Sequence, residues 1–130
     1  MNREKVKEKY IKYGLEEQDV FTHQHYLIIT RSGIEKIQAI ENINVSYQPV
    51  RSEKDFASVH CFANFVGDEK IIQTFGSALK GKTYKDGNTN SWYVMEMAEK
   101  RAFSRAVLKL TGMYELGCMG IDESEEFKRK

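Results

Sequence analysis

Residues 55–66 read DFASVHCFANFV and residues 70–78 read KIIQTFGSA, two segments joined by Gly67-Asp68-Glu69. The side chains of the first segment alternate with the two-residue period of a β-strand that buries one face. The joining residues are typical of a tight turn, so the segments predict neighbouring antiparallel strands. The face expected toward the core consists of Ala57, Val59, Cys61, Ala63 and Phe65.

A further strand is predicted just before this pair. Ile43, Val45 and Tyr47 alternate with polar residues, which indicates a half-buried strand. Pro49 is the only proline of the chain, and because it cannot donate a backbone hydrogen bond it favours a sheet edge or the end of the strand. The three strands together predict an antiparallel β-meander.

The longest helical pattern follows the meander, in residues 91–111 (SWYVMEMAEKRAFSRAVLKLT). Asn90 is interpreted as its N-cap and Gly112 as its stop. A seam of small side chains recurs every four residues and would let the helix lie close against a sheet. The seam consists of Ala98, Ala102 and Ala106, and the apolar face is widened by Met95, Phe103, Val107 and Leu110.

The first forty residues predict two short helices with a strand between them. Residues 2–13 have an amphipathic helical pattern, and residues 25–30 (HYLIIT) predict a strand. Ser32 and Glu35 predict a capping box at the start of a helix over residues 33–41, in which each side chain satisfies a backbone donor. The buried stripe of that helix is expected to be Ile34, Ile37 and Ile40.

These elements predict a single α+β domain over residues 1–130, with a frayed tail at about residues 122–130. Its expected centre is a three-stranded antiparallel β-meander packed against the long C-terminal helix, preceded by the short N-terminal helix, strand and helix. This β-β-β-α core is like that of double-stranded-RNA-binding domains. Residues 81–90, rich in Gly, Lys, Asn and Thr, predict a mobile loop or a projecting hairpin tip.

The composition argues against a membrane or secreted protein. No run of about 18 apolar residues occurs, and the first ten residues are charged where a signal peptide would be apolar. We therefore expect a cytoplasmic protein that does not associate with membranes. Cys61 and Cys118, the only cysteines, are expected to be reduced and partly buried thiols.

Positive charge is concentrated in one part of the chain. The formal net charge is only +1, but residues 80–109 hold seven basic residues against three acidic ones. Arg101, Arg105 and Lys109 are four residues apart, so they share one face of the predicted helix. Further candidates beside this row are Lys100 and, in the lead-in loop, Lys80, Lys82, Tyr84 and Lys85.

Cations beside an aromatic ring suit a sequence-tolerant site for single-stranded nucleic acid, since cations bind phosphates and bases stack on rings. The alternative is that the row is the solvated side of an amphipathic helix. Against this, only Glu96 and Lys100 form a favourable pair four residues apart. The positive charges of the basic row are therefore poorly neutralised by acidic residues of the same helix. Trp92 is interpreted as a core anchor and Phe62 as a residue buried under a helix, although Phe62 with His60 could also stack bases.

Motifs for catalysis and for metal binding are absent from the sequence. It has no nucleophile elbow, phosphate-binding glycine loop, zinc-protease motif or carboxylate cluster suited to Mg²⁺, so we expect no enzyme activity and no cofactor. We interpret the potential metal ligands as ordinary side chains and expect no metal site. These residues are His23, His25, His60 and Cys61.

The predicted long helix and its flanks resemble a known protein family. Residues 97–112 (MAEKRAFSRAVLKLTG), followed by Leu116-Gly117-Cys118 and Asp122, are similar to the alanine- and arginine-rich helix and the stretch after it in single-strand annealing proteins of the Rad fifty-two type. Residues 25–34 (HYLIITRSGI) resemble the entry strand of related phage and bacterial proteins. The likeness spans roughly residues 20–125.

The resemblance implies a β-β-β-α core that assembles side by side into rings or filaments and holds single-stranded DNA in a basic groove. It implies DNA contacts for Arg105 and Lys109, and also for Lys100 and Arg101. We therefore expect a homo-oligomeric protein of DNA recombination and repair that binds and anneals single-stranded DNA without nucleotide hydrolysis. Two alternatives remain open here: a double-stranded-RNA-binding-like module, and a protein-interaction domain with no nucleic-acid role.

Overall fold

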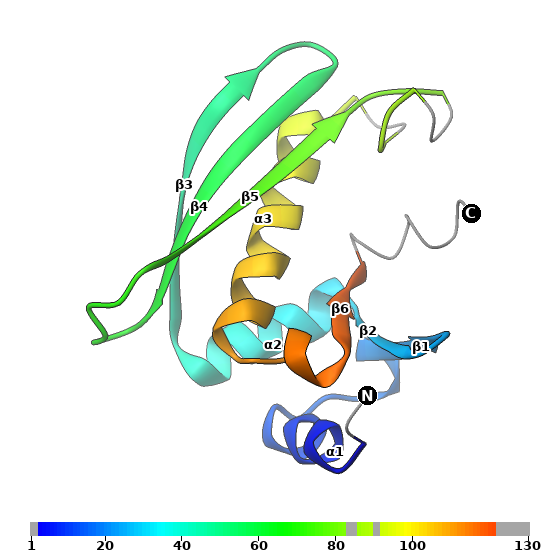
Figure 1. Cartoon of the computed structure of the whole chain (residues 1–130), viewed down its shortest axis with the longest axis vertical. Coiled ribbons are helices and arrows are strands. Elements are labelled where there is room, and N and C mark those ends of the chain that lie inside the picture. The colour runs from blue at the N-terminus through cyan, green and yellow to red at the C-terminus, as the bar shows by residue number, and fades with distance from the viewer. Residues whose placement is uncertain (1–2, 83–85, 90–91, 122–130) are drawn as a thin grey trace.

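The computed structural model describes residues 3–82, 86–89 and 92–121. Within these residues the protein is a mixed α+β structure with three α-helices and two three-stranded sheets (Figure 1). No helix in this part of the chain combines the length and the apolar character needed to span a bilayer. The elements are α1 (Arg3–Lys12), η1 (Glu17–Asp19), β1 (Val20–His23), β2 (Tyr26–Ile29), α2 (Arg31–Glu41), β3 (Ile43–Ser52), β4 (Phe56–Phe65), β5 (Ile72–Leu79), α3 (Val94–Leu110), η2 (Tyr114–Leu116) and β6 (Cys118–Gly120).

The larger sheet has the strand order β3-β4-β5 and is antiparallel throughout. The long helix α3 packs on one face of it, which confirms the expected packing of a C-terminal helix on strands (Figure 1). The alternation in β4 also holds, because its inward residues are buried while Phe65 at the strand end is only partly buried. The buried residues are Ala57, Val59, Cys61 and Ala63.

Pro49 lies within an edge strand and does not end it. β3 continues to Ser52, with an irregularity in its pairing to β4 between Pro49 and Arg51. The expected strand end at Pro49 is therefore wrong, and the other expectation, a sheet edge, is correct. An edge strand tolerates proline because one side of its backbone has no partner strand.

Close contact between α3 and the sheet depends on Gly76. A Cβ atom at Gly76 would lie 2.1 Å from the carbonyl oxygen of Ala98 and 2.6 Å from the backbone nitrogen of Ala102. Both alanines are completely buried, as is Ala106. The Oγ1 of Thr74 donates a 2.8 Å hydrogen bond to the Ala102 carbonyl, which joins strand and helix directly. The predicted alanine seam is confirmed, and glycine on the facing strand completes it.

The smaller sheet has the order β1-β2-β6. β1 and β2 form an antiparallel hairpin, whereas β2 and β6 are parallel and place Leu27 opposite Cys118. Only β2 was predicted, because β1 is short and interrupted by polar residues, and β6 has only three residues. Both cysteines are buried free thiols, and burial raises the pKa of Cys118 to about 11, which keeps it protonated.

The start of α2 differs from the predicted capping box. The N-cap is Thr30, whose side chain accepts from the backbone nitrogen of Gly33. Ser32 instead donates to a carboxylate oxygen of Asp19, and Glu35 pairs with Arg31 at 3.2 Å. Local spacing identified the helix start within two residues, but Asp19 from a preceding segment binds Ser32, and Arg31 of the same helix pairs with Glu35. In the buried stripe of α2, Ile34 and Ile37 are buried as expected, whereas Ile40 is 53 % exposed and was assigned to it wrongly.

α3 begins at Val94 and ends at Leu110. The predicted cap, Asn90, and the predicted first helical residue, Ser91, lie outside the described residues, as does the tail from residue 122. The stop is confirmed, because Gly112 has a φ of +72°, in the left-handed region that favours glycine. Beyond this turn the chain forms η2 and returns through β6 to the smaller sheet (Figure 1).

Asp19 links η1 to α2 through a buried ionic network. Its side chain is completely buried, and it accepts hydrogen bonds from the backbone nitrogen of Glu16 (2.8 Å), the hydroxyl of Ser32 (2.5 Å) and the ammonium of Lys36 (2.7 Å). Burial alone would raise the pKa of Asp19, but the hydrogen bonds from Lys36, Ser32 and Glu16, with the charge of Lys36, outweigh burial and lower the pKa.

This network predicts acid sensitivity of the fold. Because the pKa of Asp19 is lower in the folded state than its ordinary value of 3.8, the ionised carboxylate stabilises the fold at pH values above 3.8. That contribution is lost as the pH falls below 3.8 and through the folded-state pKa. We expect the unfolding free energy, measured by urea titration, to fall over this range more steeply in the native sequence than in Asp19→Asn. Equal pH slopes in the two proteins would contradict the assignment.

Candidate nucleic-acid interface

The basic row of α3 does not form one solvent-facing surface. Arg101 is only 5 % exposed, and its guanidinium donates 2.8 Å hydrogen bonds to the carbonyls of Ser77 and Asn88. Arg105 is half-buried and donates to the carbonyl of Phe75 at 2.8 Å. Lys109 and Lys100 are exposed. The expectation that the row lies together in solvent is therefore wrong for Arg101.

The position of β5 explains why the two arginines turn toward the sheet. β5 has a partner strand on one side only, so alternate carbonyls along its outer edge point away from β4. The guanidinium groups satisfy two of these carbonyls, at Phe75 and Ser77. Asn88 covers the next position: its side-chain oxygen accepts from the nitrogen of Leu79 at 2.7 Å, and its backbone nitrogen donates to the Leu79 carbonyl at 2.9 Å. The edge of β5 from Phe75 to Leu79 is thereby closed to another strand.

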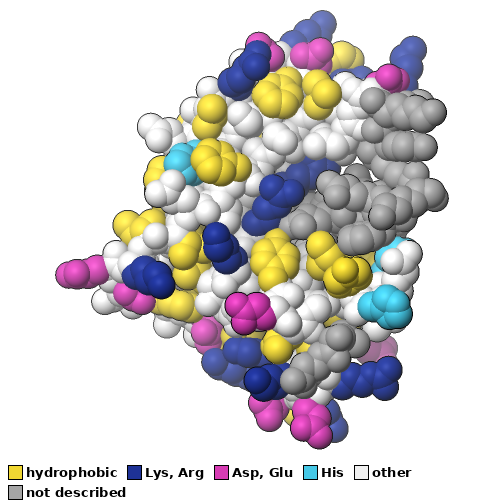
Figure 2. Space-filling view, viewed as in Figure 1, with side chains coloured by type: hydrophobic (Ala, Val, Ile, Leu, Met, Phe, Trp, Pro, Cys, Tyr) yellow, Lys and Arg dark blue, Asp and Glu magenta, His cyan; other side chains and the backbone are white. Residues whose placement is uncertain are grey.

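The face of the larger sheet opposite α3 carries an aromatic cluster formed by His60, Phe62 and Phe75. The ring of His60 stacks on that of Phe75 with centroids 4.2 Å apart and an interplanar angle of 16°, and the centroid of Phe62 is also 4.2 Å from that of His60. The His60 Nε2 is 2.7 Å from Oε1 of Gln73, which fixes the orientation of the imidazole. In Figure 2, hydrophobic side chains gather beside a histidine at the upper left, over this sheet.

Phe62 was predicted to be buried under a helix, and this prediction is wrong. In the described residues α3 covers only the Cys61 side of β4, so Phe62 stays half-exposed and Phe75 is 55 % exposed. Phe75 was missed as a candidate altogether. The exposure of Phe75 could have been predicted from the sequence. Phe75 occupies the face of its strand opposite to Thr74 and Gly76, and the sequence predicts one long helix, which can cover only one face of the sheet.

An open hollow at the edge of β5 is lined by residues of both β5 and α3. It has a volume of about 440 Å³, and its lining includes Phe75 and Gln73 from the strand and Arg105 and Lys109 from the helix. The remaining lining residues are Thr74 and Tyr114. Two of the predicted site residues, Arg105 and Lys109, thus line the same hollow as the exposed Phe75, which was not predicted as a site residue.

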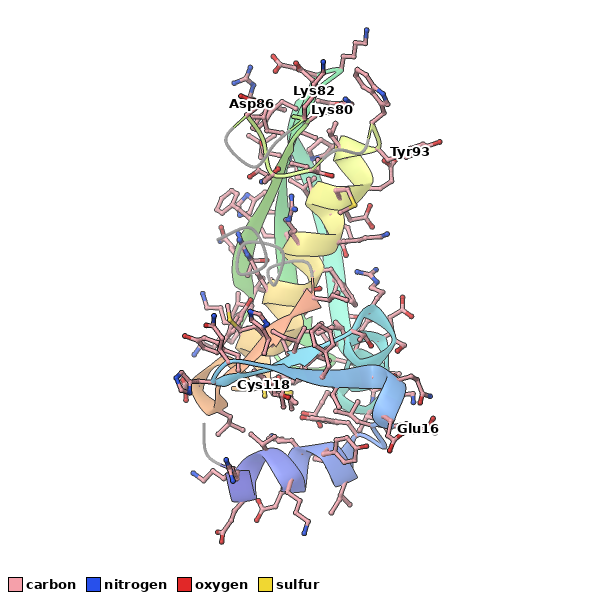
Figure 3. All side chains as sticks on the ribbon, turned by 90° about the vertical axis from the view of Figure 1, so that its right-hand side faces the viewer. Glu16, Lys80, Lys82, Asp86, Tyr93 and Cys118 are labelled. Atoms are coloured by element: carbon pink, nitrogen blue, oxygen red, sulfur yellow. The ribbon has the colours of Figure 1, made fainter. Side chains whose placement is uncertain are left out.

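The loop candidates lie at the far end of the same sheet. Lys80 and Lys82 are close together at the upper end of Figure 3, and Tyr93 projects outward from the start of α3. The ammonium of Lys80 is 3.9 Å from the ring centroid of Trp92. Tyr84 and Lys85 lie outside the described residues. The candidate site is therefore divided between two places, the hollow and this end of the sheet.

Metal ligands do not converge anywhere in the described part of the chain. No group of three or more His, Cys, Asp or Glu side chains there could hold a metal ion. His60, one of the histidines weighed as a metal ligand, is instead part of the aromatic cluster.

Comparison with known proteins adds no assignment to this geometry. No protein-family model, curated protein sequence or solved structure significantly matches the chain.

Proposed function

We propose that the protein binds single-stranded DNA along the β5 edge of its larger sheet. Phosphates would contact Arg105 and Lys109, and bases would stack on the exposed ring of Phe75, beside His60. The observation that carries this proposal is the hollow, because one open space is lined by an exposed aromatic residue, Phe75, and by two cationic residues. Stacking tolerates any base and cations bind any phosphate, so this pairing suits a site without sequence preference.

Single strands fit this surface better than duplexes do. Bases can reach an aromatic ring only when they are unpaired, and a duplex keeps its bases inside the helix. The hydrogen bond between His60 and Gln73 holds the imidazole against Phe75, so the stacking surface is ordered before a base arrives. A preordered surface reduces the entropy that binding costs.

Strand annealing is the activity we propose for this binding surface. The similarity of residues 97–112 to the helix of Rad fifty-two type annealing proteins supports a role in recombination and repair without nucleotide hydrolysis, as a homo-oligomer. Annealing requires two complementary strands held near one another, and side-by-side copies of this surface would supply that arrangement. Analytical ultracentrifugation with and without an oligonucleotide tests the assembly.

A double-stranded-RNA-binding module is the second candidate, and the order of elements favours it. α2, β3, β4, β5 and α3 follow each other as helix, three strands and helix, which is the order of double-stranded-RNA-binding domains. Competition between single-stranded DNA and duplex RNA for the protein distinguishes the two, because groove readout requires the A-form duplex. We expect single-stranded DNA to compete more strongly.

Substitutions in the hollow should separate stacking from charge. Phe75→Ala is expected to weaken binding of a single-stranded oligonucleotide by about 5- to 150-fold, the loss of one base stack, with little change in salt dependence. Lys109→Ala is expected to lower the slope of log affinity against log salt concentration by about 0.7, the effect of one phosphate contact on a single strand. Fluorescence anisotropy of a labelled oligonucleotide, measured over a salt series, reports both quantities.

Matched controls come from α1, which lies at one end of the molecule, away from the larger sheet (Figure 1). Lys7→Ala removes an exposed lysine and Ile11→Ala removes a side chain that is 68 % exposed, and both should leave affinity and salt slope unchanged. If Phe75→Ala and Lys109→Ala also bind normally, the hollow is not the DNA site. A protein-interaction role without nucleic acid, the third alternative, would then be favoured.

A further inference from the structure

Trp92 is the single tryptophan of the chain and it is not part of the core. It was predicted to anchor the start of the long helix, but its side chain is 59 % exposed, and the neighbouring Tyr93 is 72 % exposed. The prediction failed because α3 begins only at Val94, so Trp92 precedes the helix and is not directed inward by the helical period. An exposed tryptophan is uncommon on a surface without a binding role, since its large apolar area remains in water.

Two lysines lie against the Trp92 ring. The ammonium of Lys80 is 3.9 Å from the ring centroid and that of Lys54 is 5.4 Å from it. The backbone nitrogen of Lys80 donates a 2.7 Å hydrogen bond to the carbonyl of Asp55, which holds the ends of β4 and β5 together at this point. Cations at an exposed site gain only about 0.5–1 kcal/mol from such a ring, so the contacts can be exchanged for stronger ones.

This cluster lies beyond the end of the strand that borders the hollow. Phe75 and Lys80 are five residues apart along and just past β5, which corresponds to about 16 Å of extended strand. The outer face between them carries Phe56 opposite Leu79, with the guanidinium of Arg51 5.3 Å from the Phe56 ring. Apolar and cationic groups therefore continue from the hollow to the end of the sheet.

We propose that Trp92, with Lys80 and Lys54, forms a second stacking contact for the same single strand, so that the DNA runs along β5 from the hollow to the end of the sheet. This inference rests on the proposed function. A phosphate attracts the ammonium groups more strongly than the ring does, and their movement to the phosphate exposes the ring to a base. The cluster thereby supplies the cation and the ring that one nucleotide requires.

The single tryptophan makes the contact directly measurable. A base that stacks on Trp92 quenches its fluorescence, and no other tryptophan in the chain obscures the signal. We expect an oligothymidine of about 16 nucleotides to quench the emission, and a dinucleotide, which is too short to reach from the hollow to Trp92, to do so much less at equal saturation. Saturation is measured independently by anisotropy of the labelled oligonucleotide. Inorganic polyphosphate, which has charge but no bases, should not produce the same quenching.

Substitution tests whether the contact contributes to affinity. Trp92→Ala should weaken binding of the longer oligonucleotide by about 5- to 150-fold and leave that of the shorter one nearly unchanged, whereas Trp92→Phe should retain much of the affinity. Ile11→Ala is the matched control for loss of an exposed apolar side chain. Circular dichroism verifies that each variant is folded.

The outcomes separate this inference from the proposed function. If both oligonucleotides bind in a Phe75-dependent manner but Trp92 is not quenched, or its removal leaves affinity unchanged, the second contact is wrong and the hollow stands. If neither oligonucleotide binds, both proposals are wrong. If Trp92→Ala changes the sedimentation coefficient and not the affinity, Trp92 contacts a second copy of the chain, which also overturns the inference.

Discussion

Gly76→Ala is expected to destabilise the protein by about 3 kcal/mol or more, a larger effect than most single substitutions have. The added Cβ would lie 2.1 Å from the Ala98 carbonyl oxygen, a backbone atom that cannot rotate away. α3 would have to move off the sheet, and its completely buried alanines would lose contact with the strands. The hydrogen bond from Thr74 to the Ala102 carbonyl would be broken by the same movement.

Urea unfolding followed by circular dichroism measures this loss. Ser77→Ala is the matched control, because Ser77 is the next residue of β5 and its side chain is exposed on the other face of the sheet. We expect the unfolding free energy of the control to lie within about 0.5 kcal/mol of that of the native sequence. A Gly76→Ala protein as stable as this control would show that helix and sheet are not in contact at Gly76.

Arg101→Ala is expected to cost about 3–6 kcal/mol of stability, and its effect on DNA affinity should be small once the variant is folded. Each hydrogen bond from a charged donor contributes about 1.5–3 kcal/mol, and the guanidinium makes two, to the carbonyls of Ser77 and Asn88. Removal leaves partly buried carbonyls with fewer donors and an unfilled space between α3 and β5. Arg101→Lys should restore only part of the loss, because one ammonium cannot reproduce the planar guanidinium fork.

Lys100→Ala is the matched control for Arg101, since Lys100 is the preceding residue of α3 and its side chain is exposed. Lys100→Ala should change the unfolding free energy by no more than about 0.5 kcal/mol. Urea titration and oligonucleotide anisotropy on all three variants decide the role of Arg101. An Arg101→Ala protein with native stability and much weaker DNA binding would show that this side chain acts on the ligand and not on the sheet edge.

The candidate site was only partly predictable, and the reason differs from residue to residue. The four-residue spacing of Arg101, Arg105 and Lys109 correctly placed them on one helix face, but spacing does not reveal what that face meets. β5 turned out to be an edge strand, and its unpaired carbonyls draw the two arginines inward. Phe75 was overlooked for the converse reason, because its exposure depends on the absence of a covering helix on that side of the described structure.

Local periodicity by itself identified the central strand β4 and the long helix α3. The alternation in residues 55–66 identified β4 and its buried face, and the alanine seam identified the face by which α3 contacts the sheet. Both predictions succeed because a single element's hydrophobic pattern is imposed by burial against one neighbour.

Only the tertiary structure decided that β5 is an edge strand, which sheet face stays open and where Trp92 lies. The same holds for the cap of α2, where Asp19 from a preceding segment takes Ser32 as its partner. These features depend on contacts between segments far apart in the chain, and the pattern within any one segment carries no information about its partners. The surfaces proposed to bind DNA are therefore set by long-range packing, although Phe75, Arg105 and Lys109 all belong to elements that the sequence predicts.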